Sequence, residues 1–276
     1  MKEDEVIKID IDSVLRQRAS RYYKFIPRFI IRWLERTVCQ ERLNWLLERN
    51  RGRRDADFCR GVLDDLNVGI KVTGEQNLHP DTDRRVVIVS NHPLGGLDGI
   101  ALIDYVTRVY GGKIHFIVND LLMAIKPLTG VFLPINKHGK QSRASLKAIE
   151  EAFTGNDPII IFPAGLVSRR QKGGVIADLQ WQKMFVNKSV EYHRNIIPLK
   201  FNGENSGFFY KFAKFRTCLG LKFNIEMIYL PREVFRSENK EFSVVIGEPI
   251  KWDSLKSGKD AQRQADEIKE IVYNLK

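Results

Sequence analysis

The sequence predicts an α/β fold, a mainly parallel central sheet flanked by helices, with a basic helical arm at the N-terminus. Two observations predict it. From residue 69 onward, short β-branched runs alternate with segments of helical periodicity. Before residue 67, apolar residues follow a helical period and basic residues gather among them. We therefore expect a basic amphipathic helical arm at residues 1–67 and an α/β body at residues 68–276, without internal repeats.

Composition excludes several classes of protein. With 276 residues, 43% of them hydrophobic and 29% charged, the chain is globular rather than collagenous, disordered or built on disulfides. No run reaches the roughly 18 apolar residues of a membrane-spanning helix, and the acidic first residues do not resemble a secretory signal. The three cysteines form no CxxC pair. We expect a protein of the reducing cytosol, neither integral to the membrane nor exported.

Positive charge is concentrated within the arm, at residues 16–54. These contain twelve Lys or Arg and three acids, a net +9, whereas residues 1–15 carry a net −3 and the remaining 222 residues a net +5. A helix is predicted over 22–34, with Pro27 in its first turn and Arg28, Arg32 and Arg36 along one flank. Its apolar face comprises Tyr22, Phe25, Ile26, Phe29, Ile30, Trp33 and Leu34, whereas Tyr23 and Ile31 lie off that face.

Two interpretations of this face stay open. Aromatic rings beside long Arg side chains are typical of a helix lying in an anionic membrane surface. The alternative is a helix that packs on its own domain with a solvated basic edge. Two further helices are predicted in the arm, at 40–50 and 55–66.

The body is predicted to alternate strands and helices. Each strand is a short β-branched or aromatic run, and each helix shows apolar residues at spacings of three and four. The predicted strands are 70–72, 86–89, 114–118, 131–135, 159–162, 196–201, 223–229 and 242–246. The predicted helices are 98–109, 119–126, 141–153, 181–192 and 260–275. Ligands of such sheets bind beyond the carboxyl ends of the strands, so the candidate chemistry is sought there.

The first notable strand end reads Asn91-His92-Pro-Leu-Gly95-Gly96-Leu-Asp98. Asp98 can orient the imidazole of His92, and a His held in this way can take a proton from a hydroxyl group. Backbone N–H groups of a glycine turn at a helix N-terminus can bind an anion or a developing oxyanion. The alternative is that Asp98 only caps the helix.

The second strand end reads Phe162-Pro163-Ala164-Gly165, followed by Ser168, Arg169 and Arg170. An arginine pair suits a phosphate or carboxylate, because each planar guanidinium can bind two oxygens. A solvated basic loop is the alternative. The other histidines show no metal-ligand spacing, so we expect no metal site.

Taken together, these stretches resemble the glycerolipid and lysophospholipid acyltransferase family, typified by bacterial 1-acylglycerol-3-phosphate acyltransferase. The family carries an Asn-His…Asp block, a Gly-x-x-Phe-x-x-Arg block, a Phe-Pro-Glu-Gly block with a later Arg, and an apolar block around a Pro. The similar stretches here cover about residues 70–250 in the same order. They are Asn91-His92 to Asp98, Gly130 to Lys137, Phe162 to Arg169, and Ile196 to Leu199.

Three departures refine the resemblance. Five residues instead of four separate His92 from Asp98, so Gly95 and Gly96 must absorb one residue. Ala164 stands at the acid of the third block and Lys137 at the arginine of the second. The sequence is therefore most similar to the hemolysin-like branch of ornithine- and glycine-lipid O-acyltransferases, whose acceptors carry a carboxylate in place of glycerol phosphate.

The resemblance implies transfer of a fatty acyl group from acyl carrier protein or acyl-CoA to the hydroxyl of a lyso-lipid, as part of phospholipid and related lipid biosynthesis. His92 would be the general base and Asp98 its partner, with backbone N–H groups of a glycine turn holding the oxyanion and with no metal or cofactor. The implied substrate-binding residues are Asn91, Gly95, Gly96, Lys137, Phe162, Pro163, Gly165, Ser168, Arg169 and Arg170.

The expected location is peripheral, on the cytoplasmic face of the inner membrane, with an anionic membrane surface and no nucleic acid as partner. Two alternatives stay open. One is an enzyme that makes phosphatidic acid from 1-acylglycerol 3-phosphate. The other is a non-enzymatic, basic protein that binds membranes or nucleic acids through the arm.

Overall fold

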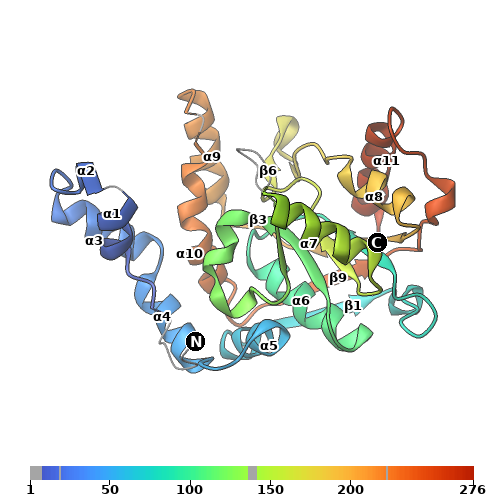
Figure 1. Cartoon of the computed structure of the whole chain (residues 1–276). Helices are drawn as coiled ribbons and strands as arrows, with labels where there is room; N and C mark the ends of the chain where they lie inside the picture. Colours follow the sequence, from blue (N-terminus) through green and yellow to red (C-terminus); the bar gives the residue numbers. More distant parts are fainter. Residues whose placement is uncertain (1–7, 19, 136–141, 222) are drawn as a thin grey trace.

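The computed structural model describes residues 8–18, 20–135, 142–221 and 223–276, arranged around one seven-stranded sheet (Figure 1). Five adjacent strands run parallel. At one side of them, β9 (Glu241–Ile246) pairs antiparallel with β8 (Asn195–Asn202) and parallel with β1 (Gly69–Thr73). In spatial order the strands are β1 (Gly69–Thr73), β9 (Glu241–Ile246), β8 (Asn195–Asn202), β2 (Val86–Ser90), β5 (Ile159–Ile161), β3 (His115–Asn119) and β4 (Phe132–Ile135). The expected mainly parallel α/β sheet is confirmed.

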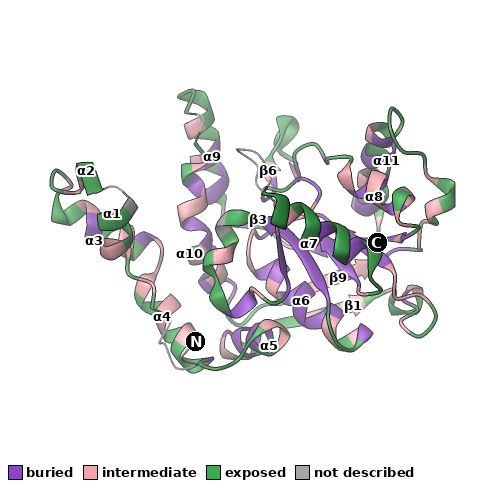
Figure 2. Ribbon diagram, viewed as in Figure 1, coloured by how far each residue is buried: buried purple, intermediate pink, exposed green. Residues whose placement is uncertain are grey.

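Helices cover both faces of the sheet, and the pleat of β2 shows how. Val86 and Ile88 join the core beneath α5 (Asp55–Asp65) and α6 (Leu97–Tyr110). Val87 and Val89, which point to the opposite face, join a second core. Three helices cover that core: α7 (Arg143–Thr154), α8 (Met184–Glu191) and α11 (Ala261–Asn274). Because β2 is buried on both sides, its first four residues are all apolar. The central strands of the sheet are buried (Figure 2).

One predicted strand is wrong. Residues 223–229, read as a β-branched strand, form irregular chain and a 3₁₀ turn, η5 (Ile225–Tyr229), that continues into α10 (Leu230–Arg236). The buried residues of η5 and α10 are Glu226, Tyr229, Leu230, Glu233 and Phe235, and the first four recur at spacings of three and four, which belong to a helix. The preceding helix α9 (Gly207–Cys218) was not foreseen. Its aromatic composition does not favour a helix over a strand.

Other elements outside the sheet are short. The predicted helix at 119–126 consists of two 3₁₀ turns, η2 (Asp120–Ala124) and η3 (Lys126–Leu128). A two-stranded ribbon, β6 (Arg169–Arg170) with β7 (Ile176–Ala177), follows β5. Three further 3₁₀ turns are η1 (Glu75–Asn77), η4 (Lys172–Gly174) and η6 (Trp252–Ser254).

The arm is helical, but the helix predicted over 22–34 is broken. The arm helices are α1 (Ile11–Arg18), α2 (Ser20–Tyr23), α3 (Arg28–Thr37), α4 (Gln40–Arg49) and α5. Pro27 is the extended N-cap of α3 and not a residue of its first turn. A proline disfavours helical geometry in the residue before it, so the chain turns at 24–26. Tyr22, Phe25 and Ile26 therefore lie outside the helix that carries Phe29 and Trp33.

The arm is joined to the body through its later helices. Leu46 of α4 and Phe58 of α5 belong to the core beneath the sheet, and Arg42 forms an ion pair of 2.9 Å with Glu238. By contrast, α1, α2 and α3 stand away from the sheet at the left of Figure 1. The boundary at residue 67 stays a prediction, although α5 packs directly on α6. Within the described residues, no helix is long and apolar enough to span a membrane.

A buried arginine ties the second helical layer to the sheet. The guanidinium of Arg194, just before β8, is fully buried and donates to the carbonyls of Ala152, Phe153 and Gly155 at the end of α7. It also donates to the carbonyl of Asp157, before β5. Burial lowers the pKa of Arg194 to about 10, so the group stays charged at neutral pH. A cation at this position satisfies the last carbonyls of a helix and its negative dipole end.

We expect Arg194→Met to lower the free energy of unfolding by about 3 kcal/mol or more, because several buried carbonyls lose their donor at once. Chemical denaturation at neutral pH measures the change. Arg263→Met is the matched control, since Arg263 is exposed and pairs only with Glu267 on the surface of α11. It should change stability by no more than about 0.5 kcal/mol. Equal effects of the two variants would contradict the structural role of Arg194.

Candidate active site

The two notable strand ends lie side by side. β2 and β5 are neighbours and parallel, so their carboxyl ends reach the same edge of the sheet. The ring of His92 stacks on Phe162 with centroids 4.0 Å apart. The N–H of Ser168 donates to the carbonyl of His92 at 2.8 Å. The structure thus brings together the His–Asp block and the Phe-Pro-Ala-Gly block.

His92 and Asp98 are in hydrogen-bond contact. Nδ1 of His92 lies 2.9 Å from Oδ2 of Asp98, in the first turn of α6. Gly95 makes this contact possible, because its φ of +76° lies in the left-handed region that glycine adopts without strain. A Cβ at Gly95 would also collide with Leu230 and Val167. The five-residue spacing is therefore accommodated by a tight glycine turn.

The first glycine turn is folded around the same carboxylate. The N–H groups of Leu94 and Gly95 donate to Oδ2 of Asp98 at 2.9 and 3.3 Å, and that of Gly99 donates to Oδ1. The N-cap of α6 is Gly96, so helix capping does not account for Asp98. The N–H groups of Leu94 and Gly95 are committed to Asp98. An oxyanion must therefore be held by other donors, and Gly95 acts through its backbone geometry.

The electrostatics define the protonation of the pair. Burial alone would raise the pKa of the Asp98 carboxyl, but His92 and the surrounding N–H groups outweigh it, so that the pKa lies below its usual value. An ionised carboxylate only accepts hydrogen bonds, so Nδ1 of His92 carries the proton. Nε2 is then the nitrogen of His92 that can accept a proton, and the side chain is 15% exposed. This arrangement suits a general base.

Asn91 holds the end of β2 in place. Its amide nitrogen donates to the carbonyl of Phe201 at 2.9 Å, and its amide oxygen accepts from the N–H of Phe201 at 2.7 Å. Both ends of the side chain are thus engaged by β8. The neighbouring Ser90 is fully buried, and its hydroxyl donates to the carbonyl of Asn91. The structure gives Asn91 a positioning role, and its assignment as a substrate ligand stays a prediction.

The second block forms a turn beneath His92. The N–H of Gly165 donates to the carbonyl of Phe162 at 2.9 Å, and Gly165 has φ +61°. The carbonyl of Pro163 accepts from the N–H of Gln182, which fixes the turn to the chain before α8. Ala164 is buried, where the resembling family has an acid. Phe162 therefore supplies one wall of the site by stacking on the imidazole.

Sequence analysis missed Asp178. Its buried Oδ1 accepts from the backbone N–H of His92 at 3.2 Å and from the hydroxyl of Ser168, while Oδ2 accepts from Nε1 of Trp181 at 2.9 Å. Ser168 in turn donates its N–H to the His92 carbonyl. The main chain of His92 is thus held on both sides. Asp178 lies in a segment without periodicity, and no sequence signal marks it.

The two arginines have different surroundings. Arg169 was expected to bind an acceptor anion, but its guanidinium contacts Glu226 at 2.7 Å. Glu226 is fully buried and also pairs with Arg216 of α9 at 2.7 Å. Arg169 is thus engaged in an internal ion-pair triad, whereas Arg170 is exposed and lies over the ring of Tyr210. Of the two, Arg170 is the one whose side chain is exposed. Substrate binding by either arginine stays a prediction.

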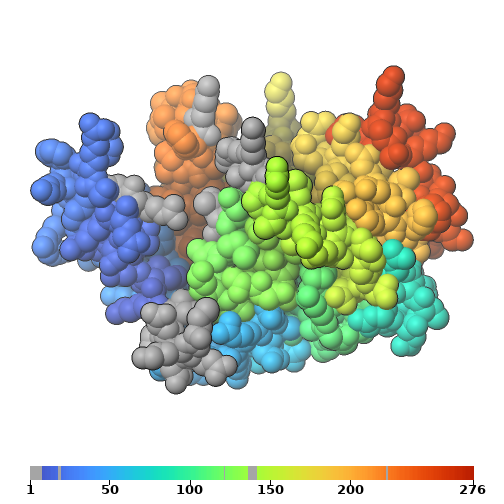
Figure 3. All heavy atoms as spheres, viewed as in Figure 1, coloured from blue at the N-terminus to red at the C-terminus, as the bar shows by residue number. Residues whose placement is uncertain are grey.

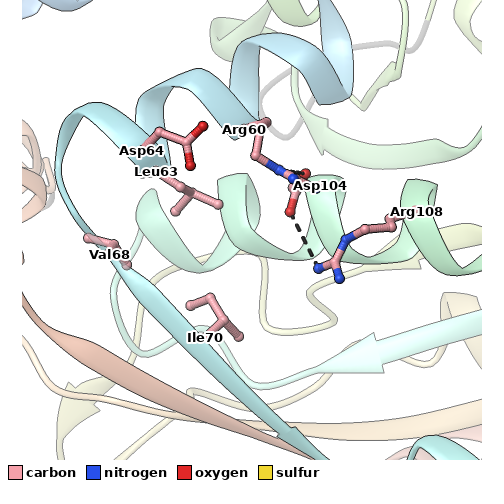
Figure 4. A pocket seen from close by; sticks show the side chains of 7 residues that line it. All are labelled: Arg60, Leu63, Asp64, Val68, Ile70, Asp104 and Arg108. Carbon is pink, nitrogen blue, oxygen red and sulfur yellow. Dashed lines mark hydrogen bonds and ion pairs between the residues drawn. The ribbon is translucent and has the colours of Figure 1, made fainter.

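The remaining expectations lie elsewhere. Lys137 falls outside the described residues. The described part of the chain contains no cluster of three or more His, Cys, Asp or Glu side chains that could hold a metal. A pocket between α5, α6 and β1 shares no residue with the predicted site, and in it Arg60 and Arg108 both contact Asp104 (Figure 4).

Three comparisons relate this chain to known proteins. A family model described as Acyltransferase matches residues 13–276. The lyso-glycine lipid O-acyltransferases of Bacteroides thetaiotaomicron and Phocaeicola vulgatus are each 42% identical over 275 residues, covering this whole chain and 100% and 98% of theirs. The crystal structure of the 1-acyl-sn-glycerophosphate acyltransferase of Thermotoga maritima is 19% identical, with a TM-score of 0.46 over 95% of this chain and 96% of that one.

We expect the stability that Asp98 contributes to depend on pH. Because folding lowers the pKa of its carboxyl, this stability is present above the ordinary value near 4 and is lost as the pH falls through the folded value. Asp98→Asn should therefore cost about 2 kcal/mol at pH 7 and less in acid. Urea unfolding at several pH values measures it, with the exposed Asp266→Asn as control. If the difference in unfolding free energy between the wild type and Asp98→Asn does not shrink in acid, the assignment is contradicted.

Proposed function

This chain belongs to the acyltransferase family, and from that membership we propose that it is a lyso-lipid O-acyltransferase acting on an N-acyl-3-hydroxy amino-acid lipid, with lyso-glycine lipid as the acceptor. An acyltransferase is an enzyme, so the non-enzymatic alternative is excluded. The names of the two relatives at 42% identity support the acceptor. The single observation that carries the mechanism is the His92 imidazole oriented by the buried Asp98 carboxylate.

The proposed chemistry is a direct transfer. Nε2 of His92 takes the proton of the acceptor hydroxyl while the oxygen of that hydroxyl attacks the carbonyl carbon of the acyl thioester. The tetrahedral intermediate collapses with loss of the thiolate, which receives the proton from the imidazolium. Asp98 stabilises the imidazolium formed in between. Ser90, the hydroxyl nearest in sequence, is buried and hydrogen-bonded to Asn91, which supports transfer without an acyl-enzyme.

The acceptor assignment agrees with the charge available near the site. A glycine-lipid acceptor presents one singly charged carboxylate, which a single exposed guanidinium such as Arg170 can pair. The second guanidinium, Arg169, is engaged by Glu226. A phosphate monoester is larger and carries more charge, so one exposed guanidinium compensates it less.

We propose that the enzyme works as a peripheral protein on the cytoplasmic face of the inner membrane, with acyl carrier protein or acyl-CoA as donor and without a cofactor. The arm supports this location. Phe25 and Phe29 are 82% and 71% exposed, and Tyr22 and Trp33 are exposed as well. Arg28, Arg32 and Arg36 are exposed around them. Exposed aromatic and cationic side chains together suit an anionic lipid surface.

We expect His92→Ala to lower turnover by about 10² to 10⁴, the usual worth of a general base, while the protein stays folded with a melting temperature lowered by the loss of one donor to Asp98. Release of the free thiol from an acyl thioester in the presence of lyso-glycine lipid measures turnover. His115→Ala is the control, since His115 is also a largely buried histidine near a carboxylate, Asp157, but lies at the opposite end of its strand. Wild-type turnover in His92→Ala would refute the mechanism.

Asp178→Asn extends the same experiment, because it keeps the imidazole and weakens the hydrogen bonds that hold the main chain of His92 and the hydroxyl of Ser168. A smaller loss of kcat than in His92→Ala, with the pH profile displaced, is the expected result.

Offered lyso-glycine lipid and lysophosphatidic acid in competition with one acyl thioester, the purified protein should acylate the lyso-glycine lipid preferentially. The reason is that Ala164 and Lys137 replace the acid and arginine of the glycerol-phosphate enzymes. Mass spectrometry of the lipid products measures the ratio. Preferential formation of phosphatidic acid would overturn the acceptor assignment and leave the acyltransferase activity intact.

A further inference from the structure

Helix α9 and the turn after it expose a set of large apolar side chains that the proposed chemistry does not use. We call this set the α9 surface. Phe223 is the most exposed of them, at 82%. The α9 surface comprises Phe208, Phe215, Leu219, Leu221, Phe223 and Ile225.

The α9 surface is separate from the face by which α9 packs on the body. The buried residues of α9 are Phe209, Tyr210 and Ala213. The first two belong to a core cluster with Val167 and Leu230, the residues that also enclose Gly95. Phe208, Phe215 and Leu219 recur at spacings of seven and four and therefore lie along another stripe of the helix. The helix is already anchored by one apolar face and presents a second to its surroundings.

The charge around the α9 surface has one sign. Residues 207–225 contain three lysines and one arginine but no acidic residue. Arg216 is paired with the buried Glu226, which it shares with Arg169, so its guanidinium is engaged inside the protein. Lys211 and Lys214 are exposed. The α9 surface is therefore apolar with a basic flank, the pattern of a segment that lies in the headgroup region of an anionic bilayer.

We propose that the α9 surface is a second membrane contact, which inserts Leu219, Leu221 and Phe223 into an anionic lipid surface. This inference rests on the proposed function, since a lipid acceptor has to be collected from a membrane. A second copy of the chain is a poorer occupant, because two basic flanks would face each other. In Figure 3, α9 (orange) and the arm (blue) form two separate protrusions from the body.

Such a contact would hold the site near the headgroups. The inner face of α9 packs against Val167, which follows the Phe162 block, and Arg216 is tied through Glu226 to Arg169. Docking of α9 therefore fixes the second block relative to the bilayer. The buried triad gives the connection rigidity, since breaking it would leave an unpaired charge in the interior.

The first test is flotation of the full chain with vesicles of phosphatidylglycerol and phosphatidylcholine. We expect the double variant Leu219→Asp, Phe223→Asp to bind about tenfold more weakly or worse, because two apolar contacts are replaced by like-charge repulsion with the lipid. Leu146→Asp is the matched control, an exposed leucine on α7. Lys211→Glu with Lys214→Glu is a second variant that leaves the apolar residues in place and should also weaken binding, most clearly at low salt.

The second test reads insertion directly. Cys218 is exposed at the end of α9, whereas Cys59 is buried and Cys39 partly buried, so an environment-sensitive fluorophore can be attached to Cys218 without a new cysteine. With vesicles, its emission should shift to the blue and be quenched by lipids brominated in their acyl chains. The Cys218→Ser protein corrects for labelling elsewhere.

The outcomes separate the two proposals. Vesicle binding unchanged in both α9 variants, or an unquenched label, overturns the membrane contact. So does a change from dimer to monomer in the Leu219→Asp, Phe223→Asp variant, which would make the α9 surface an interface between two copies. Turnover of detergent-dispersed lyso-glycine lipid should stay within about twofold of the wild type in these variants. If the wild type lacks that turnover but still inserts Cys218, the proposed function fails while the membrane contact stands.

Discussion

The geometry of the site depends on one buried carboxylate, that of Asp98. A charge without access to water is tolerated only where hydrogen bonds replace its hydration, and four donors do so here. Three of the four come from the chain between His92 and Gly95. Folding the loop and orienting the imidazole are therefore the same event. A change that moves Gly95 would disturb the base even though Gly95 itself need not touch a substrate.

The sheet supplies the second constraint, because it decides which loops can meet. β2 lies between β8 and β5, and each neighbour restrains the loop that follows it. Asn91 is bridged to Phe201 of β8, and Phe162 after β5 stacks on His92. Asp178 then clamps the His92 main chain from a segment that belongs to no sheet strand. The base is held by three parts of the chain that are distant in sequence, which agrees with the precision that proton transfer needs.

The positive charge of the chain serves two distinct purposes. Some cations are internal: Arg194 donates to carbonyls at the end of α7, and Arg169 and Arg216 share the buried carboxylate of Glu226. Others, such as Arg28 and Arg32 on the arm and Lys211 on α9, are exposed beside aromatic side chains. Only the second group offers exposed cationic side chains that an anionic surface can contact. The formal net charge therefore overstates the cations available for binding at the site itself.

The sequence by itself determined the α/β class, seven of the eight predicted strands and the pairing of His92 with Asp98, because apolar periodicity and a glycine turn are local properties of the chain. It misjudged 22–34, where Pro27 breaks the helix, and 223–229, where β-branched residues form a helical turn around Glu226. Only the tertiary structure decided the partners of Arg169 and the role of Asp178. Each is defined by a contact with a residue far along the chain, and neither an ion pair with Glu226 nor a hydrogen bond to the His92 backbone leaves a periodic trace in the sequence.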